Sequence, residues 1–359
     1  MNLIYQEFIQ AVKACSGPVL WVVDEHALHL TPSQLGDTSR ITFITNRVDQ
    51  MNSLTEDGLT CHYSDFEFDA LPQSGFDLVL YRVSKEKAIV HHVINQAAQV
   101  LKPNGKLVLA GGKNEGIKTY VDKATKYLNA EKHIEKISKD DWIAELKNQH
   151  SDEPSLDDKN YRELIEINQQ NGLSLISKPG VFGWNKVDQG SAYLIEQMPE
   201  FMKRLNLSKD QVTQSVIDLG CGYGYLLSSM PQFGFKTLVG TDNNAAAITA
   251  AKATLAANDL EGEIIAANCA EGIDQKFDVV VCNPPFHQGF SVEGELTDRF
   301  LASARRLLVS GGAAIFVVNA FIPIESKAKH YFKKVDELAN NKKFKVIRLA
   351  GKKPYQAEL

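Results

Sequence analysis

Two stretches of this chain nearly repeat each other, and the repetition constrains the fold more than any other feature. Residues 76–83 read FDLVLYRV and residues 277–284 read FDVVVCNP. A strand-like segment with an aspartate precedes each stretch, PVLWVVDEH at 18–26 and SVIDLGCGYG at 215–224, and a helical pattern and a further strand follow. Alternating strands and helices of this kind form a mostly parallel sheet covered on both faces. The repeat therefore predicts two tandem α/β domains.

The second half alternates between short apolar strands and helices. Expected elements are strands at Ser215–Leu219, Lys236–Gly240, Glu263–Ala267, Asp278–Cys282, Ala313–Val318 and Lys343–Leu349, and helices from about Gly224 and at Ala245–Ala257. The polar segment 147–160 is the best candidate for a linker or surface loop, which divides the chain into domains 1–165 and 166–359. Ligands of such sheets bind at the carboxyl ends of the strands.

Composition narrows the class of protein. No apolar run approaches 18 residues and the first residues do not read as a signal peptide, so we expect a cytoplasmic protein. Five cysteines without CxxC spacing indicate reduced thiols and no metal site. The net charge of −5 argues against nonspecific coating of nucleic acid. Ten basic and two acidic residues between Lys327 and Lys353 are either a solvated surface or the contact region for a polyanion.

A glycine loop follows the first strand of the second half. Glycine permits positive φ, and the helix start beyond it offers free N–H groups to a nucleotide. The dinucleotide pattern GxGxxG requires glycine at position 225, where this chain has Tyr225. The spacing instead resembles the first motif of class I S-adenosylmethionine-dependent methyltransferases, although a dinucleotide enzyme or a structural turn stays open. The candidate cofactor contacts here are Asp218, Gly220, Cys221, Gly222 and Gly224.

Polar residues also follow the next two strands. Asp242, with Asn243 beside it, can accept hydrogen bonds from both hydroxyls of a ribose, or can instead cap the helix that follows. At the end of the third strand, Asn268 can bind a purine edge with its amide and Cys269 with its backbone N–H, unless this is an ordinary turn. These positions support a nucleoside-containing cofactor without choosing its class.

The fourth strand ends in Asn283-Pro284-Pro285-Phe286. This resembles the Asn-Pro-Pro-Tyr/Phe motif of methyltransferases that act on planar, conjugated nitrogens. The Asn283 oxygen and the Pro284 carbonyl can accept the two N–H hydrogens of such an amine, and the rigid prolines hold the carbonyl in place. Phe286 can stack on a base, a contact worth about 1–3 kcal/mol. His287 is a substrate contact or a packed side chain, and a strand-ending turn is the plain alternative.

Longer stretches resemble one family, the ribosomal RNA small subunit methyltransferase C family. They are NPPFHQG at 283–289, VNAFIP at 318–323 and KFKV at 343–346, with PGVF at 179–182 and DQGS at 188–191 before the glycine loop. The resemblance implies a guanine-N2 methyltransferase with S-adenosylmethionine as cofactor. It also implies a degenerate first domain, for scaffolding or RNA docking, and an active second domain.

The resemblance implies ribosomal RNA, within the small subunit, as the partner. We expect the enzyme to be a monomer and to bind neither membrane nor metal. Three alternatives stay open. The acceptor could be a guanine of large-subunit RNA, whose methyltransferase shares NPPFH, or a glutamine amide of a protein. The chain could also be a noncatalytic RNA-binding assembly protein.

Overall fold

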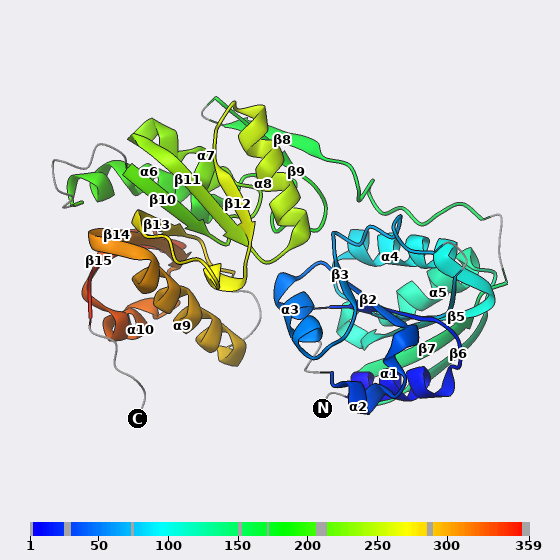
Figure 1. The fold of residues 1–359 in the computed structure, drawn as a ribbon. Coiled ribbons are helices and arrows are strands. Elements are labelled where there is room, and N and C mark those ends of the chain that lie inside the picture. Colours follow the sequence, from blue (N-terminus) through cyan, green and yellow to red (C-terminus); the bar gives the residue numbers. More distant parts are fainter. Residues whose placement is uncertain are drawn as a thin grey trace. The chain divides into compact units, whose positions relative to one another are not determined.

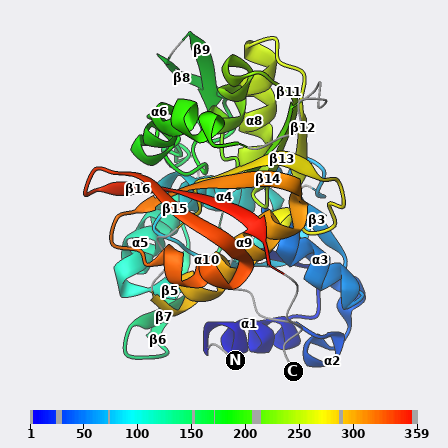
Figure 2. The same cartoon turned by 90° about the vertical axis from the view of Figure 1, so that its left-hand side faces the viewer.

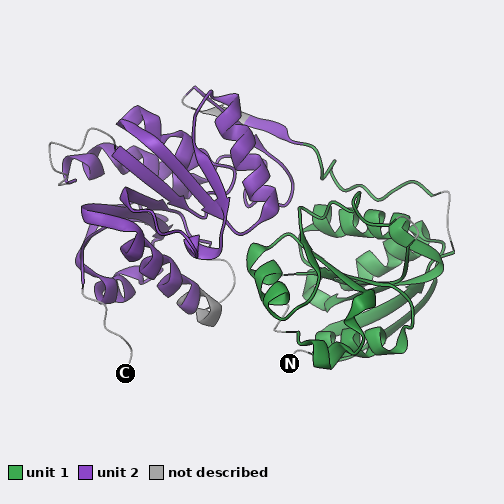
Figure 3. Cartoon of the chain, in the orientation of Figure 1, with its two compact units in different colours: residues 1–163 green, residues 164–359 purple. Residues whose placement is uncertain are grey.

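The chain folds into two compact units, residues 1–163 and 164–359, coloured separately in Figure 3. The computed structural model describes residues 3–24, 30–72, 75–149, 153–170, 172–205, 214–285 and 290–353. Within them each unit contains one seven-stranded sheet, with the orders β3-β2-β1-β4-β5-β7-β6 and β12-β11-β10-β13-β14-β16-β15. The two orders are the same strand for strand, which confirms the expectation of two tandem, mostly parallel α/β sheets.

Unit 1 contains β1 (Val19–Val23), β2 (Ile41–Thr45), β3 (Cys61–Tyr63), β4 (Phe76–Arg82), β5 (Leu101–Gly112), β6 (Glu131–Lys136) and β7 (Asp141–Lys147). Its helices are α1 (Leu3–Ala14), α2 (Pro32–Leu35), α3 (Val48–Glu56), α4 (Lys87–Val100) and α5 (Ile117–Tyr127). The first five strands run parallel, and β7 is antiparallel to β5 and β6. Helices α4 and α5 cover one face of the sheet, while α1 and α3 cover the other (Figure 1).

Unit 2 begins with a hairpin of β8 (Ile165–Gln170) and β9 (Leu173–Ser177). Its sheet contains β10 (Gln214–Leu219), β11 (Phe235–Asp242), β12 (Glu263–Ala266), β13 (Phe277–Cys282), β14 (Leu308–Asn319), β15 (Phe332–Asn340) and β16 (Phe344–Lys352). Its helices are α6 (Gln189–Lys203), α7 (Tyr225–Ser228), α8 (Ala245–Ala257), α9 (Phe290–Leu307) and α10 (Ile324–Tyr331). In the described part of the chain, no helix combines the length and apolarity needed to cross a membrane.

The buried strands of unit 2 divide their side chains between two helical layers. Val279 and Val281 of β13 pack with α6 and α8, whereas Val280 and Cys282 pack with α9 and α10, as expected for a strand covered on both faces. The two layers are visible on opposite sides of the sheet in Figure 2. This packing leaves the carboxyl ends of β10 to β13 as the edge at which loops gather.

Strand β15 is absent from the prediction, which placed a single last strand at Lys343–Leu349. The sequence of β15, FKKVDELAN, carries four charged residues and lacks a continuous apolar run. Antiparallel pairing with β16 makes it the edge of the sheet, where charged side chains face water and discourage further strand pairing. The basic stretch is therefore largely an edge hairpin.

Most of the polar segment expected as a linker or surface loop is an anchored surface segment of unit 1. Leu156 exchanges two hydrogen bonds with the side chain of Asn95 in α4, at 2.8 and 2.9 Å. Just beyond the segment, the buried Tyr161 hydroxyl donates to Asp65 at 2.6 Å. Residues 153–161 thus use buried polar contacts that the composition of the segment did not indicate.

Candidate functional site

The glycine loop between β10 and α7 is the first part of the site. Gly220, Gly222 and Gly224 have φ values of 73°, 55° and 84°, in the left-handed region that side chains disfavour. The N–H groups of Gly220 and Cys221 both donate to the Thr241 carbonyl, at 2.8 and 2.9 Å, which holds the loop against β11. A methyl group added at Gly222 would meet no atom within 4 Å. The loop therefore leaves room for a ligand against its backbone.

Asp242, the last residue of β11, faces this loop. Its two carboxylate oxygens accept the N–H groups of Gly222, at 3.1 Å, and Asn244, at 3.0 Å. Each oxygen can accept a further hydrogen bond, so the half-buried carboxylate fits a pair of ribose hydroxyls. Asn244 caps α8 by accepting the Ala246 N–H at 2.9 Å. The capping role that the sequence left open for Asp242 thus belongs to Asn244, and half-buried Asn243 lies between them.

Asp218 lies in β10 and is fully buried. Burial, and then repulsion from Asp242, raise the pKa of Asp218 to about 8, against a smaller opposite effect of the Leu227 N–H. The carboxyl group is therefore mostly protonated at neutral pH. A cation bound nearby would favour the ionised form.

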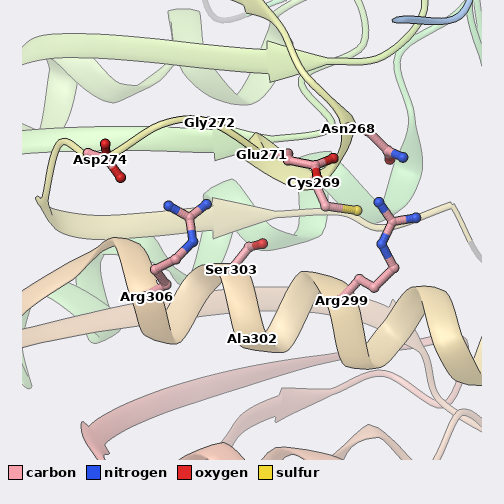
Figure 4. A pocket seen from close by; sticks show the side chains of 9 residues that line it. All are labelled: Asn268, Cys269, Glu271, Gly272, Asp274, Arg299, Ala302, Ser303 and Arg306. Atoms are coloured by element: carbon pink, nitrogen blue, oxygen red, sulfur yellow. The ribbon is translucent and has the colours of Figure 1, made fainter. Parts of the chain in front are cut away.

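Asn268 and Cys269 follow β12, where the Ala267 N–H donates to the Asp242 carbonyl at 2.9 Å. Cys269 and Ala270 have φ values of 49° and 58°, two consecutive left-handed residues that are not glycine. Figure 4 shows the side chains of this turn opposite those of α9, across a pocket of about 430 Å³. The pocket is lined by Asn268, Cys269, Glu271, Gly272, Asp274, Arg299, Ala302, Ser303 and Arg306. The predicted adenine contacts thus form one wall of a pocket.

Asn283 leaves β13 beside the glycine loop. Strands β10 and β13 pair in parallel with Leu219 opposite Cys282, so Gly220 and Asn283 leave neighbouring strands at the same level. Pro284, the next residue, is buried. The loop expected to hold the cofactor and the motif expected to hold the acceptor therefore lie side by side.

The carboxamide of Asn283 is held by the start of α6. Its Nδ2 donates to Asp188 Oδ2 at 2.8 Å and to Ser191 Oγ at 2.9 Å. Asp188 Oδ2 also accepts the Ser191 N–H at 2.8 Å, as the N-cap of α6. One helix start thus supplies both partners of the amide nitrogen.

The remaining predicted residues of the motif are not all placed. Pro285 is exposed, whereas Phe286 and His287, the expected substrate contacts, lie outside the described residues. Among the residues that are described, no group of three His, Cys, Asp or Glu side chains could hold a metal ion.

Comparison with known proteins identifies the family. The model of the methyltransferase small domain matches residues 172–348, and the model of its N-terminal companion matches residues 22–137. Ribosomal RNA small subunit methyltransferase C from Mannheimia succiniciproducens is 30% identical over 292 residues, 80% of this chain and 83% of that protein. The protein of the same name from Shewanella piezotolerans is 30% identical over 285 residues, 76% of this chain and 77% of that protein. The chain belongs to the ribosomal RNA small subunit methyltransferase C family.

One solved structure shares the fold of this chain over nearly the whole length of the chain. It is a 16S rRNA N2 methyltransferase from T. thermophilus in complex with AdoMet and guanosine. The TM-score is 0.78 at 22% identity, over 96% of this chain and 91% of that one. The tandem arrangement of the two sheets is therefore common to both proteins.

The sequence prediction named neither Asp188, Ser191 nor Asn244 as an individual site residue, although the family resemblance included DQGS at 188–191, in a segment that helps cover the cofactor. An aspartate before an amphipathic helix signals an N-cap, so the local role of Asp188 was readable from the sequence. Its contact with Asn283 joins residues 95 positions apart, and no local pattern encodes such a contact. Gly180 lies next to the N-cap of α8, because its carbonyl accepts from Asn244 Nδ2 at 3.4 Å.

Proposed function

We propose that this chain transfers the methyl group of S-adenosylmethionine to the exocyclic N2 of a guanine in small-subunit (16S) ribosomal RNA. The observation that carries the proposal is the pairing of Leu219 with Cys282, which brings the glycine loop and the Asn-Pro-Pro motif to one level of the sheet. The names of the relatives, and the AdoMet and guanosine in the T. thermophilus structure, support the same donor and acceptor.

The cofactor would be held by residues at or near the carboxyl ends of four neighbouring strands, β10 to β13. The glycine loop would border its methionine part and ribose, with Asp218 beneath the loop. Asp242 would accept from both ribose hydroxyls, next to Asn243. The adenine edge would contact the Asn268 amide and the Cys269 N–H. The full set is Asp218, Gly220, Cys221, Gly222, Gly224, Asp242, Asn243, Asn268, Cys269 and Asn283.

The acceptor amine is a poor nucleophile, because its lone pair is delocalised into the guanine ring. Asn283 Oδ1 and the Pro284 carbonyl accept its two N–H hydrogens and so aim the lone pair at the donor. The cofactor supplies a sulfonium methyl group: the N–C bond forms as the C–S bond breaks, and the electron pair of that bond stays on sulfur. The nitrogen then releases one proton to water. Positioning contributes much of the acceleration, and Phe286 would stack on the base.

The two units take different parts in this proposal. Unit 2, residues 164–359, is the catalytic domain, and unit 1, residues 1–163, serves as a scaffold or RNA-docking domain; the boundary expected after residue 165 would have cut strand β8. A guanine N2 that is paired in a duplex is inaccessible, so the target base is single-stranded or flipped out. We expect the enzyme to act as a monomer in the cytoplasm, where ribosomal particles assemble.

Tritiated methyl transfer to ribosomal particles tests the proposal. The substrates are small subunits, large subunits and free RNA from cells that lack the gene, and digested nucleosides are separated after the reaction. We expect label in N2-methylguanosine from the small subunit. Asn283→Ala should lower the rate about 100-fold or more, because a preorganised transition-state contact is lost.

Other outcomes of the same experiment would replace the proposal. Label in the large subunit would change the RNA target, and label in a protein fraction would point to a glutamine amide. Cofactor binding by calorimetry without transfer to any fraction would indicate a noncatalytic assembly protein. Unchanged incorporation by Asn283→Ala would remove the proposed role of this residue.

A further inference from the structure

The orientation of the Asn283 carboxamide is set from outside its own motif. Its Nδ2 lies 2.8 Å from Asp188 Oδ2 and 2.9 Å from Ser191 Oγ. A carboxylate can only accept hydrogen bonds, so the atom that faces Asp188 has to be the NH₂ group. Within the described residues these are the hydrogen bonds of this side chain. The opposite end of the amide, Oδ1, is therefore the end turned away from α6.

This orientation decides whether Asn283 can hold an amine. With Oδ1 toward the substrate, the side chain accepts an N–H of the guanine amino group. A 180° rotation of the amide would present its own N–H groups to that amine, donor against donor, and would place Oδ1 against the Asp188 carboxylate. Nothing in the sequence around Asn283 distinguishes these two states, since the amide oxygen and nitrogen have nearly the same shape.

We propose that Asp188 and Ser191 are positioning residues that lock the Asn283 carboxamide in the orientation in which its oxygen accepts a hydrogen bond from the amine. The inference rests on the methyl transfer proposed above and adds two residues from the start of α6 to it. Ser191 is 7% exposed, so its hydroxyl is not available to water as a general surface group would be. A Cβ at Gly190 would lie 3.0 Å from Asp188 Oδ2, so glycine at this position leaves space for the carboxylate.

Asp188 has two tasks that a suitable substitution separates. Its Oδ2 caps α6 through the Ser191 N–H and also accepts from Asn283. Serine caps helices about as well as aspartate but is one atom shorter, so Asp188→Ser keeps the cap and removes the contact with Asn283. Ser191→Ala removes the second contact and leaves the cap carboxylate in place.

Steady-state kinetics at saturating S-adenosylmethionine, with small-subunit RNA as acceptor, give the first readout. We expect kcat to fall about 10–100-fold in Asp188→Ser and about 3–10-fold in Ser191→Ala, as for lost hydrogen bonds to charged and neutral partners. The Kd for the cofactor should stay within about twofold of wild type by calorimetry, a difference too small to register as a lost contact. Ser326→Ala is the matched control, because this exposed serine bonds the Pro323 carbonyl at the start of α10.

A double-mutant cycle separates positioning from general support of the fold. If Asp188 acts through Asn283, then Asp188→Ser costs nothing further in an Asn283→Ala background. Rescue gives the converse test. Asn283→Asp alone should be inactive, because two carboxylates would meet, and adding Asp188→Asn should restore activity by supplying an N–H donor to residue 283. Equal losses in both backgrounds, or no rescue, would overturn the inference.

A readout without substrate completes the test. In protein labelled with ¹⁵N-asparagine, the side-chain NH₂ of Asn283, assigned by its loss in Asn283→Ala, should exchange slowly with water. Exchange should accelerate in Asp188→Ser and remain unchanged in Ser326→Ala. If wild-type protein transfers no methyl group to guanine but the NH₂ of Asn283 still exchanges slowly, the proposed function is refuted and the orientation of Asn283 is not. Fast exchange in an active wild type would refute the lock alone.

Discussion

The two sheets of this chain have one topology and end in different chemistry. Strand pairing matches them residue by residue, because Val19 pairs with Ile41 and Leu78 in unit 1 as Val216 pairs with Leu238 and Val279 in unit 2. Four residues further along each of these three strands, the residues of the two units differ in chemical type. Unit 1 has Val23, Thr45 and Arg82 where unit 2 has Gly220, Asp242 and Asn283.

Arg82 shows what replaced the ligand site in unit 1. Its guanidinium lies 3.1 Å from Asp24 and 2.8 Å from Glu115, and all three side chains are at most 15% exposed. Unit 1 therefore closes its strand ends with internal ion pairs, whereas unit 2 keeps a glycine loop, a carboxylate and an amide at the same level. The comparison teaches that the sheet determines where a site can lie, and a few residues at the strand ends determine whether one exists.

The largest expected effect comes from giving unit 2 the residue of unit 1. Asn283→Arg should lower kcat for methyl transfer about 1000-fold or more, because it removes the oxygen that accepts a hydrogen bond from the amine and puts a cation beside a sulfonium donor. Tritiated methyl transfer measures this loss. Arg82→Lys in unit 1 is the control and should leave the rate unchanged. If Asn283→Arg retained a tenth of the activity, the residues at these strand ends would not account for the functional difference between the units.

Breaking the ion pairs of unit 1 should affect stability without affecting chemistry. Arg82→Met removes the cation from two carboxylates that are only 13% and 15% exposed, a loss that typically costs about 3–5 kcal/mol. Urea unfolding followed by circular dichroism should place the loss in the transition of unit 1. Arg162→Met is the matched control, since the Arg162–Asp69 pair at 2.6 Å is about half exposed on both sides and should contribute less than about 1 kcal/mol. Similar losses in both variants would contradict the closed-end description of unit 1.

A third pair of variants compares Asp242 of unit 2 with Thr45, the matching residue of unit 1. Asp242→Ala should weaken binding of S-adenosylmethionine about 10–100-fold, because hydrogen bonds to a carboxylate are lost. Thr45→Ala, at the matching position of unit 1, should leave the Kd unchanged. Isothermal calorimetry on both proteins makes the comparison. An equal loss in Thr45→Ala would mean that unit 1 contributes to cofactor binding after all.

Much of this comparison was readable from the sequence. Alignment of FDLVLYRV with FDVVVCNP already places Arg82 opposite Asn283, and strand register gives the same match. Helix α8 begins and ends where the sequence predicts, at Ala245 and Ala257, because an alanine-rich, helix-favouring run follows the capping Asn244.

Other features depend on tertiary contacts that no local pattern carries. The strand β15 lacks apolar alternation, and its place at the edge of the sheet follows from pairing with β16 alone. The pairing of Arg82 with Glu115, like that of Asn283 with Asp188, joins segments that the fold alone brings together. The position of a polar residue at a strand end was thus predictable, and its partner was not.

The smallest expected effect concerns the position two residues beyond the matched valines, Trp21 in unit 1 and Asp218 in unit 2. Both are fully buried, but only Asp218 can ionise. The pKa of Asp218 rises from 3.8 to about 8 on folding, so between about pH 4 and pH 8 the folded state retains a proton that the unfolded state loses, and stability falls as pH increases. Asp218→Asn removes this slope and should stabilise cofactor-free unit 2 by about 1–3 kcal/mol at pH 8, with little gain near pH 4.

Denaturant unfolding at several pH values tests this last difference. Asp278→Ala is the contrasting control, because the buried Asp278 carboxylate accepts from the Ser215 N–H and hydroxyl at 2.8 and 2.9 Å, and loss of this acceptor should destabilise the unit. Parallel pH profiles for wild type and Asp218→Asn would show that Asp218 does not carry the slope. If the stabilities of wild type and Asp218→Asn converge only at low pH, then the Asp218 carboxyl group destabilises cofactor-free unit 2 at higher pH. Unit 1 has a buried tryptophan, Trp21, at the matching position and carries no such cost.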